Sequence, residues 1–220
     1  MPRDVPILLP LTTLHQDVDE GCRAYGWAVR GPLSLDDVDE LELDAETPGE
    51  RRAAAARLVA WSEDRHPEDD VEVTPAMLLA HAGEQLTTVG DHEAALDLYR
   101  RAVRAEGDVV PDVRCHLHHG LIQAGDVNAA HQLAEEVRRS GPADVDVYAL
   151  IGEDYEVVGD LVEANRWMNL GLRRLIDALE DPDGPPPDFV AALFLTARRR
   201  VRQALGFPPD EFDLMLPPVQ

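Results

Sequence analysis

The stretch Pro111–Gly120, which reads PDVRCHLHHG, holds the densest group of side chains that could do chemistry. Asp112, Cys115 and His119 are spaced i, i+3 and i+7, so a helix would place all three on one face. Carboxylate, thiolate and imidazole groups are zinc ligands, and Cys115 with His119 at i, i+4 could share one ion. Two interpretations are therefore open. Asp112, Cys115 and His119 form a metal site, or they are surface and packed residues that bind no metal.

Signatures of the common enzyme classes do not occur in this sequence. It has no lysine, which excludes a Walker-type phosphate loop, a Schiff-base amine and a Ser-Lys pair. It also lacks the Gly-x-Ser-x-Gly, Gly-x-Gly-x-x-Gly and Cys-x-x-Cys motifs. His92-Glu93 begins like the zinc-protease helix, but Leu96 stands where the second histidine ligand must be. We therefore expect a protein that is not an enzyme and uses no cofactor.

The elements that position these side chains are indicated by a recurring Gly-Asp pair. Gly90, Gly125 and Gly159 are each followed by aspartate and are separated by 35 and 34 residues. An alanine stands five residues after each glycine, where a small side chain lets two helices approach closely. The same phase recurs in Leu79-x-x-Ala82-Gly83-x-x-Leu86, in Tyr148-x-x-Ile151-Gly152-x-x-Tyr155, and in the positions Tyr99, Ala134 and Met168. In the middle unit, His118 stands where the other two have glycine.

This pattern resembles the tetratricopeptide repeat, a helix-turn-helix unit with an aromatic residue, Leu-Gly, a tyrosine, a Gly-Asp turn and spaced alanines. The third unit matches best, and the three units cover Pro75–Ala178, about half of the chain. The resemblance implies an all-α, right-handed α-solenoid of helical hairpins, in which the first helices line a concave groove. It also implies that the chain binds another protein or a peptide in that groove.

Helix signals divide the chain into six parts. Thr47-Pro48-Gly49-Glu50 has the form of a capping box, Thr74-Pro75 and Pro111-Asp112 open helices with a proline, and the three Gly-Asp aspartates are candidate N-caps. The first two parts are an N-terminal extension at 1–33 and a degenerate leading hairpin with a charged linker at 34–74. Three repeats follow at 75–180, then a Pro-rich break at 181–187, a capping helix at 188–206 and an extended tail at 207–220. The aromatic content of the N-terminal extension favours its docking on the solenoid.

The phase of the repeats assigns seven residues to the groove. They are Glu84 and Thr88 from the first unit, Asp112, Cys115 and His119 from the second, and Glu153 and Glu156 from the third. Relatives that grip a C-terminal carboxylate use lysine, arginine and asparagine at groove positions, which this groove lacks. We therefore expect a neutral or basic partner whose arginine or lysine meets Glu84, Glu153 and Glu156.

Overall charge and composition further limit the classes of partner that we expect. The formal net charge is -23 and the pI is near 4.5, which disfavours nucleic acid as a partner because its affinity comes from Lys and Arg. A mimic of nucleic acid is a third alternative, beside the interaction module and the metal-binding protein. The apolar run PILLPL is interrupted by proline, and the two cysteines are too few for a disulfide framework. We expect a cytoplasmic protein without a membrane partner, and the sequence leaves its oligomeric state open.

The remaining conspicuous side chains have structural interpretations. Four arginines at 198–202 are expected to pair with the acidic body or with the tail at Asp210–Asp213. The last helix is expected to bury Phe189, Leu193, Ala197 and Val201 on one face. Trp27, Trp61 and Trp167 are expected to act as packing anchors.

Overall fold

The computed structural model describes residues 30–180 and 189–217 of the 220-residue chain. These residues form ten helices and no strand, which confirms the all-α prediction for this part of the chain. The helices are α2 (Leu35–Leu43), α3 (Pro48–Glu63), α4 (Pro75–Thr88), α5 (His92–Ala102), α6 (Val113–Gln123), α7 (Val127–Ser140), α8 (Val145–Val157), α9 (Leu161–Glu180), α10 (Phe189–Ala204) and α11 (Glu211–Leu214). The predictions for residues 1–29, with Cys22 and Trp27, and for the break at 181–187 lie outside the described residues.

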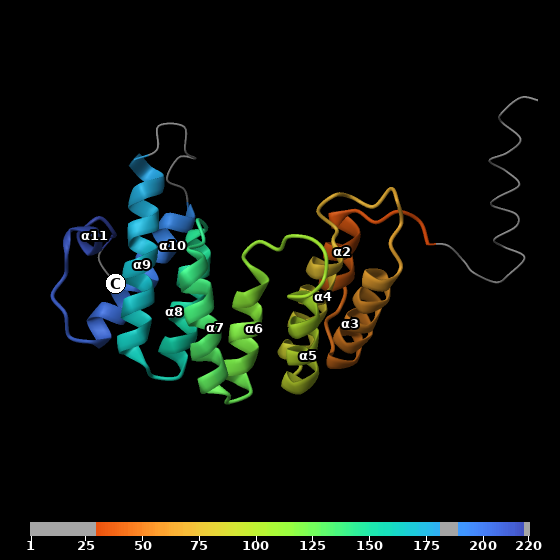
Figure 1. The fold of residues 1–220 in the computed structure, drawn as a ribbon, viewed down its shortest axis with the longest axis horizontal. Coiled ribbons are helices and arrows are strands. Elements are labelled where there is room, and N and C mark those ends of the chain that lie inside the picture. The colour runs from red at the N-terminus through yellow and green to blue at the C-terminus, as the bar shows by residue number, and fades with distance from the viewer. Residues whose placement is uncertain (1–29, 181–188, 218–220) are drawn as a thin grey trace, which may run out of the picture.

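Helices that follow one another in sequence lie in a row, from α2 and α3 at one end to α10 and α11 at the other (Figure 1). α4 packs on α5, α6 on α7, and α8 on α9. The first helices of these pairs, α4, α6 and α8, also contact one another in turn, and α8 contacts α10. The four alternate helices therefore form one continuous face, and this face carries the candidate site.

Each of the three Gly-Asp turns follows a helix and contains a glycine in the left-handed region. Gly90, Gly125 and Gly159 have φ angles of 78°, 78° and 80°, a conformation that costs a side-chain-bearing residue free energy. The repeated glycines are thus explained by the turn that joins the two helices of each pair.

The predicted N-caps are confirmed in part. The carboxylates of Asp126 and Asp160 each accept a hydrogen bond from the backbone N–H three residues on, at 3.1 Å. Asp91 occupies the N-cap of α5 but makes no side-chain cap, so the prediction is wrong there. Pro111 does not open α6 either, because Asp112 is the N-cap and the proline lies before it.

Small residues let the paired helices approach closely, as the spacing predicts. Ala95, Ala130 and Ala164, five residues after the turn glycines, are all buried. Gly83 on α4 lies against the buried ring of Tyr99 on α5, since a Cβ built at Gly83 would stand 2.4 Å from Tyr99 Cε1.

Replacing Gly83 with alanine is expected to lower the free energy of unfolding by about 1–2 kcal/mol. The added methyl group overpacks the α4–α5 contact at a cost of about 1–3 kcal/mol, and the better helix propensity of alanine offsets about 1 kcal/mol. Urea unfolding followed by circular dichroism measures the change. Gly49→Ala is the matched control, because the nearest atom to its Cβ is 3.9 Å away, and it should lose no stability. Equal stabilities of the two variants would contradict the close approach.

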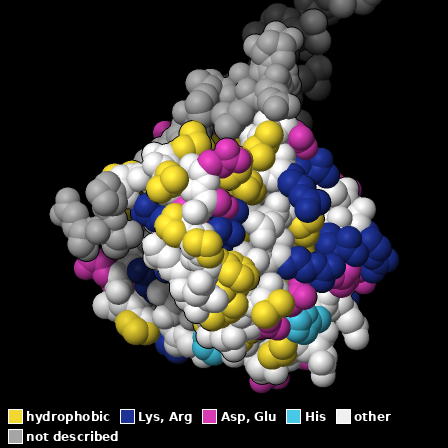
Figure 2. Space-filling view, turned by 90° about the vertical axis from the view of Figure 1, so that its left-hand side faces the viewer, with side chains coloured by type: hydrophobic (Ala, Val, Ile, Leu, Met, Phe, Trp, Pro, Cys, Tyr) yellow, Lys and Arg dark blue, Asp and Glu magenta, His cyan; other side chains and the backbone are white. Residues whose placement is uncertain are grey.

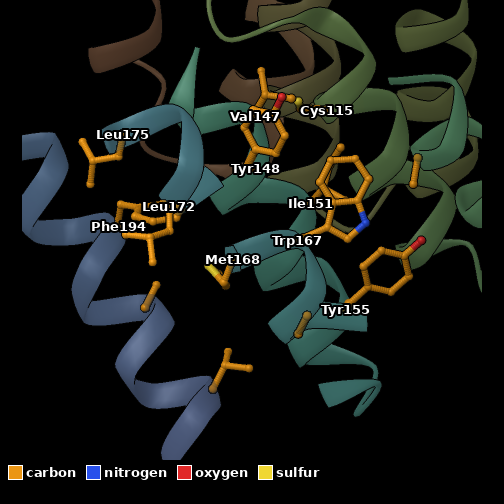
Figure 3. Close-up of a cluster of buried hydrophobic side chains, with 14 of the residues drawn as sticks. Cys115, Val147, Tyr148, Ile151, Tyr155, Trp167, Met168, Leu172, Leu175 and Phe194 are labelled. Carbon is orange, nitrogen blue, oxygen red and sulfur yellow. The ribbon is translucent and has the colours of Figure 1, made fainter. Parts of the chain in front are cut away.

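The largest apolar cluster lies towards the C-terminal end of the row, mainly between α8, α9 and α10, and includes residues of α6 and α7. It contains the buried side chains of Tyr148, Ile151, Trp167, Met168 and Phe194 (Figure 3). A second cluster joins α2, α3, α4 and α5, and a third lies between α5, α6 and α7. Because each cluster is shared by neighbouring helices, no helix pair buries its apolar side chains alone.

The leading helices begin where the sequence predicts. Ser34 caps α2 and Thr47 caps α3, each with a complete capping box, and Pro48 opens α3. Trp61 packs partly buried against the second cluster, as expected of an anchor. The segment between α3 and α4, which contains the charged linker, is held by two hydrogen bonds of 2.6 Å from Arg30 to the carboxylate of Asp69.

The C-terminal end of the chain differs from the prediction in two respects. On α10 Leu193 is 54% exposed, whereas Phe194 is buried, so the buried face includes a position that the helical spacing did not select. The tail is not simply extended, because residues 211–214 form the short helix α11. Tail residues Phe212 and Leu216 pack against the largest cluster.

Arginines of α10 hold this tail in place. Arg198 binds Asp210 at 2.6 Å and Arg202 binds Asp213 at 3.0 Å, which confirms the predicted pairing of the arginine cluster with the acidic tail. Figure 2, which looks onto this end of the row, shows arginine side chains beside aspartates and glutamates.

Candidate functional site

Two adjoining pockets lie along the face formed by the alternate helices, and we call them together the groove. The first, a cavity of about 450 Å³, is lined by side chains of α4, α6 and α8 and by Tyr99 of α5. We call it the histidine pocket, because His116 and His119 line it. The second, of about 460 Å³, lies between α8, α10 and Pro111. Leu150 and Glu153 line both pockets, so the two adjoin.

The structure brings most of the predicted groove residues to this place. Glu84, Thr88, Cys115, His119 and Glu153 line the histidine pocket. The other two predicted residues, Asp112 and Glu156, line neither pocket. The carboxylate of Asp112 instead accepts hydrogen bonds from the backbone N–H and the Nε of Arg114, at 2.9 and 3.0 Å.

The structure does not place Asp112, Cys115 and His119, the residues of the metal interpretation, as a group that could hold a metal ion. Asp112 is paired with Arg114, Cys115 is buried in the largest apolar cluster, and His119 is hydrogen-bonded to Asp154. Burial raises the pKa of the Cys115 thiol, so that the thiolate a metal needs is disfavoured. Across residues 30–180 and 189–217, no group of three or more His, Cys, Asp or Glu side chains is placed to hold a metal ion.

Asp154 of α8 joins two consecutive histidines of α6. Its carboxylate lies 2.6 Å from Nδ1 of His118, which is fully buried, and 2.7 Å from Nδ1 of His119. Burial opposes ionisation of Asp154, but the hydrogen bonds from both histidines outweigh it and lower the pKa of this carboxyl. The hydrogen bond between His119 and Asp154 also raises the pKa of His119. Because Nδ1 of His119 is occupied, a ligand in the histidine pocket can reach only its Nε2.

A second carboxylate-histidine pair forms the opposite wall of the histidine pocket. Glu84 of α4 lies 2.9 Å from Nδ1 of His116 on α6. The ring of His116 stacks on Tyr99, with the centroids 5.9 Å apart. Burial alone would raise the pKa of Glu84. The hydrogen bond with His116 and the charges of nearby histidines together outweigh burial, so the pKa of Glu84 is lowered. Burial raises the pKa of Tyr99 to about 12, so this phenol stays protonated.

Arg200 of α10 occupies the part of the groove where a basic partner is predicted to bind. Its guanidinium lies 3.2 Å from the carboxylate of Glu153 and 2.7 Å from that of Glu156. These contacts raise the pKa of Arg200. Two of the three glutamates assigned to the partner are thus already paired with a residue of this chain.

Several residues of the groove escaped the sequence interpretation. His116, Leu150, Asp154, Val157 and Arg200 all line it, yet none was assigned to it. A usable signal existed for two of them. His116 precedes His119 by three residues, and Leu150 precedes Glu153 by three, so helical geometry places each beside a predicted groove residue.

Histidine-carboxylate pairs should make the stability of the fold depend on pH. The pKa of His81, bonded to Glu42, and that of His119 are raised above the ordinary value of 6.5. Their stabilising effect is therefore complete below about pH 6.5 and is lost as the pH rises through the raised values. The pKa values of Glu84 and Asp154 are lowered, so their effect is present above about pH 4.5 and is lost on acidification.

We expect the free energy of unfolding to be highest between about pH 4.5 and 6.5 and to fall towards pH 8.5. Urea midpoints measured across this range give the profile. In the variant carrying both His81→Gln and His119→Gln, the fall between about pH 6.5 and 8.5 should become clearly smaller. An unchanged slope in that variant would assign the pH dependence to other groups, such as the net negative charge.

Two further findings concern membrane spans and known proteins. Within the described parts of the chain, none of the helices has both the length and the apolar character needed to cross a membrane. Compared with known proteins, the chain matches no family model and no curated protein.

Proposed function

We propose that this chain is a protein-interaction module, a right-handed solenoid of tetratricopeptide-like hairpins whose groove binds a segment of a partner protein. The observation that carries the proposal is the pair of adjoining pockets along α4, α6, α8 and α10, the first helix of each hairpin and the last long helix. Grooves of this kind suit extended or helical peptide segments.

Exposed apolar side chains in the groove favour binding of a partner segment. Val157 at the end of α8 is 71% exposed, Leu193 on α10 is 54% exposed, and Leu150 lies between the two pockets. A bound segment would remove these side chains from water, at about 25 cal/mol per Å² of apolar surface buried. Such side chains within a concave site are typical of peptide and protein interfaces.

The charges of the groove favour a neutral or basic partner. Glu84 and Asp154 are paired only with histidines, whereas the arginine in the groove is already engaged by Glu153 and Glu156. An acidic segment would therefore meet carboxylates whose charge is only partly compensated.

We infer no catalytic role for the groove. His119 with Asp154 has the form of a general base, but catalysis of acyl transfer would also need an activated nucleophile. Cys115, which lines the same pocket, is buried and its thiol pKa is raised, so it does not supply one.

Val157 and Val162 offer a matched test of this function. Both are exposed valines, at 71% and 69%, but only Val157 lines the groove. Peptides are selected from a random library displayed on phage, and their affinity is measured for Val157→Asp and Val162→Asp. We expect about a tenfold loss for Val157→Asp and none for Val162→Asp. Failure to select any peptide, or equal affinity of both variants, would argue against a binding groove.

A further inference from the structure

We propose that the histidine pocket is a site for one cationic side chain of the partner, an arginine or a lysine, while the second pocket takes an uncharged residue. This inference rests on the proposed function, because it specifies which part of a bound segment each pocket accepts. It follows from a difference between the two halves of the groove in charge and in hydrogen-bonding groups.

The charge of the two pockets is balanced differently. In the second pocket Arg200 already supplies a guanidinium, which binds Glu153 and Glu156. In the histidine pocket the carboxylates of Glu84 and Asp154 come from facing helices, and no arginine is among the described residues that line it. A second cation would therefore meet carboxylates that are paired only with histidines in the first pocket, and Arg200 in the other.

The hydrogen-bonding groups of the histidine pocket match a cation as well. A carboxylate can only accept, so the Nδ1 atoms of His116 and His119 carry the protons donated to Glu84 and Asp154. In the neutral imidazole the other ring nitrogen, Nε2, is then an acceptor. While both imidazoles are neutral, the walls of the pocket thus present acceptors, whereas a guanidinium or ammonium group has only donors.

Size and apolar lining fit the rest of such a side chain. A cavity of about 450 Å³ lies within the range of about 300–1,000 Å³ that is typical of small-ligand pockets. Leu150 and Val157 line it beside the charged groups, where the aliphatic stem of arginine or lysine can pack. The cavity, the two oriented imidazoles and this apolar lining support the site together, beyond the charge of the two carboxylates.

A pair of small probes tests the site without any partner peptide. The probes are N-acetyl-arginine methylamide and its citrulline counterpart, which has nearly the same shape but no charge. Each is titrated into the full chain at about pH 9, because the pKa of His119 is raised above the ordinary imidazole value, and the ring resonances of His116 and His119 are followed by NMR. We expect the arginine probe to shift both resonances and the citrulline probe to bind at least about tenfold more weakly.

Charge-removing variants then locate the site. Glu84→Gln should weaken the arginine probe about fivefold, whereas Glu93→Gln, an equivalent change on the exposed side of α5, should leave it unchanged. Arg200→Gln should not weaken it. Circular dichroism of each variant establishes that the fold is retained.

Three results would overturn the inference: equal binding of the two probes, no shift of either histidine, or equal affinities of the Glu84 and Glu93 variants. None of these results contradicts the proposed function by itself, because peptides selected from the library could still bind the groove, with an affinity that depends on Val157. Conversely, if no peptide binds but the arginine probe behaves as expected, the pocket is a cation site and the interaction groove is wrong.

Discussion

Trp167→Ala is expected to lower the free energy of unfolding by about 3–5 kcal/mol, among the largest losses that a single substitution in this chain can cause. Trp167 is almost completely buried on α9, and its ring lies 5.8 Å from that of Tyr148 on α8, centroid to centroid. It belongs to the cluster that joins α8, α9 and α10 (Figure 3), so alanine would leave a cavity where three helices meet. Guanidinium unfolding followed by circular dichroism measures the loss.

Trp61→Ala is the matched control, since Trp61 on α3 is only partly buried and Arg57 covers its ring. It should cost less than half as much as the change at Trp167. Similar losses for the two tryptophans, or a loss below about 1 kcal/mol at Trp167, would contradict the placement of the main cluster.

Asp154→Ala is expected to cost about 3 kcal/mol, although aspartate is an unfavourable residue inside a helix. The change removes the hydrogen-bond partner of His118, which is fully buried and whose Nε2 has no partner among the described residues. It also removes a second hydrogen bond between α6 and α8, because His119 loses its partner as well.

Asp97→Ala, at an exposed position of α5, should change stability by less than about 0.5 kcal/mol and so controls for the loss of one negative charge. Asp154→Asn keeps an acceptor for one histidine and should fall between the two. If Asp154→Ala and Asp97→Ala prove equally stable, the histidine-aspartate network does not hold α6 against α8.

Most of the helices could be predicted from the sequence because local rules determine where they begin, although the start of α6 and the short helix α11 were not predicted. Glycine at Gly90, Gly125 and Gly159 marks a backbone conformation that few other residues adopt, and the alanines five residues later mark contacts within the same pair. These residues are close in sequence to the turns and helix contacts that they indicate, so a single sequence is enough to recognise them.

The polar network of the groove could not be predicted in this way. His118 and Asp154 are 36 residues apart, and Arg200 is 44 residues from Glu156, so each pair depends on how successive helices are rotated. Helical spacing identified the face of α6 that carries Cys115 and His119 but not the helix that packs against it. For this reason the spacing alone did not reveal that the facing residue, Asp154, binds His119 and that Cys115 is buried in the apolar cluster.

The position of a bound segment tests the central claim, that the face of alternate helices is the binding surface. A peptide selected from the random library is given a nitroxide spin label, and the methyl signals of the chain are recorded by NMR. We expect strong broadening for Leu150, Val157 and Leu193, which line the groove, and little for the exposed Leu43 and Val71, which lie outside it. Broadening centred on Leu43 or Val71, with the signals of the groove unchanged, would contradict the central claim.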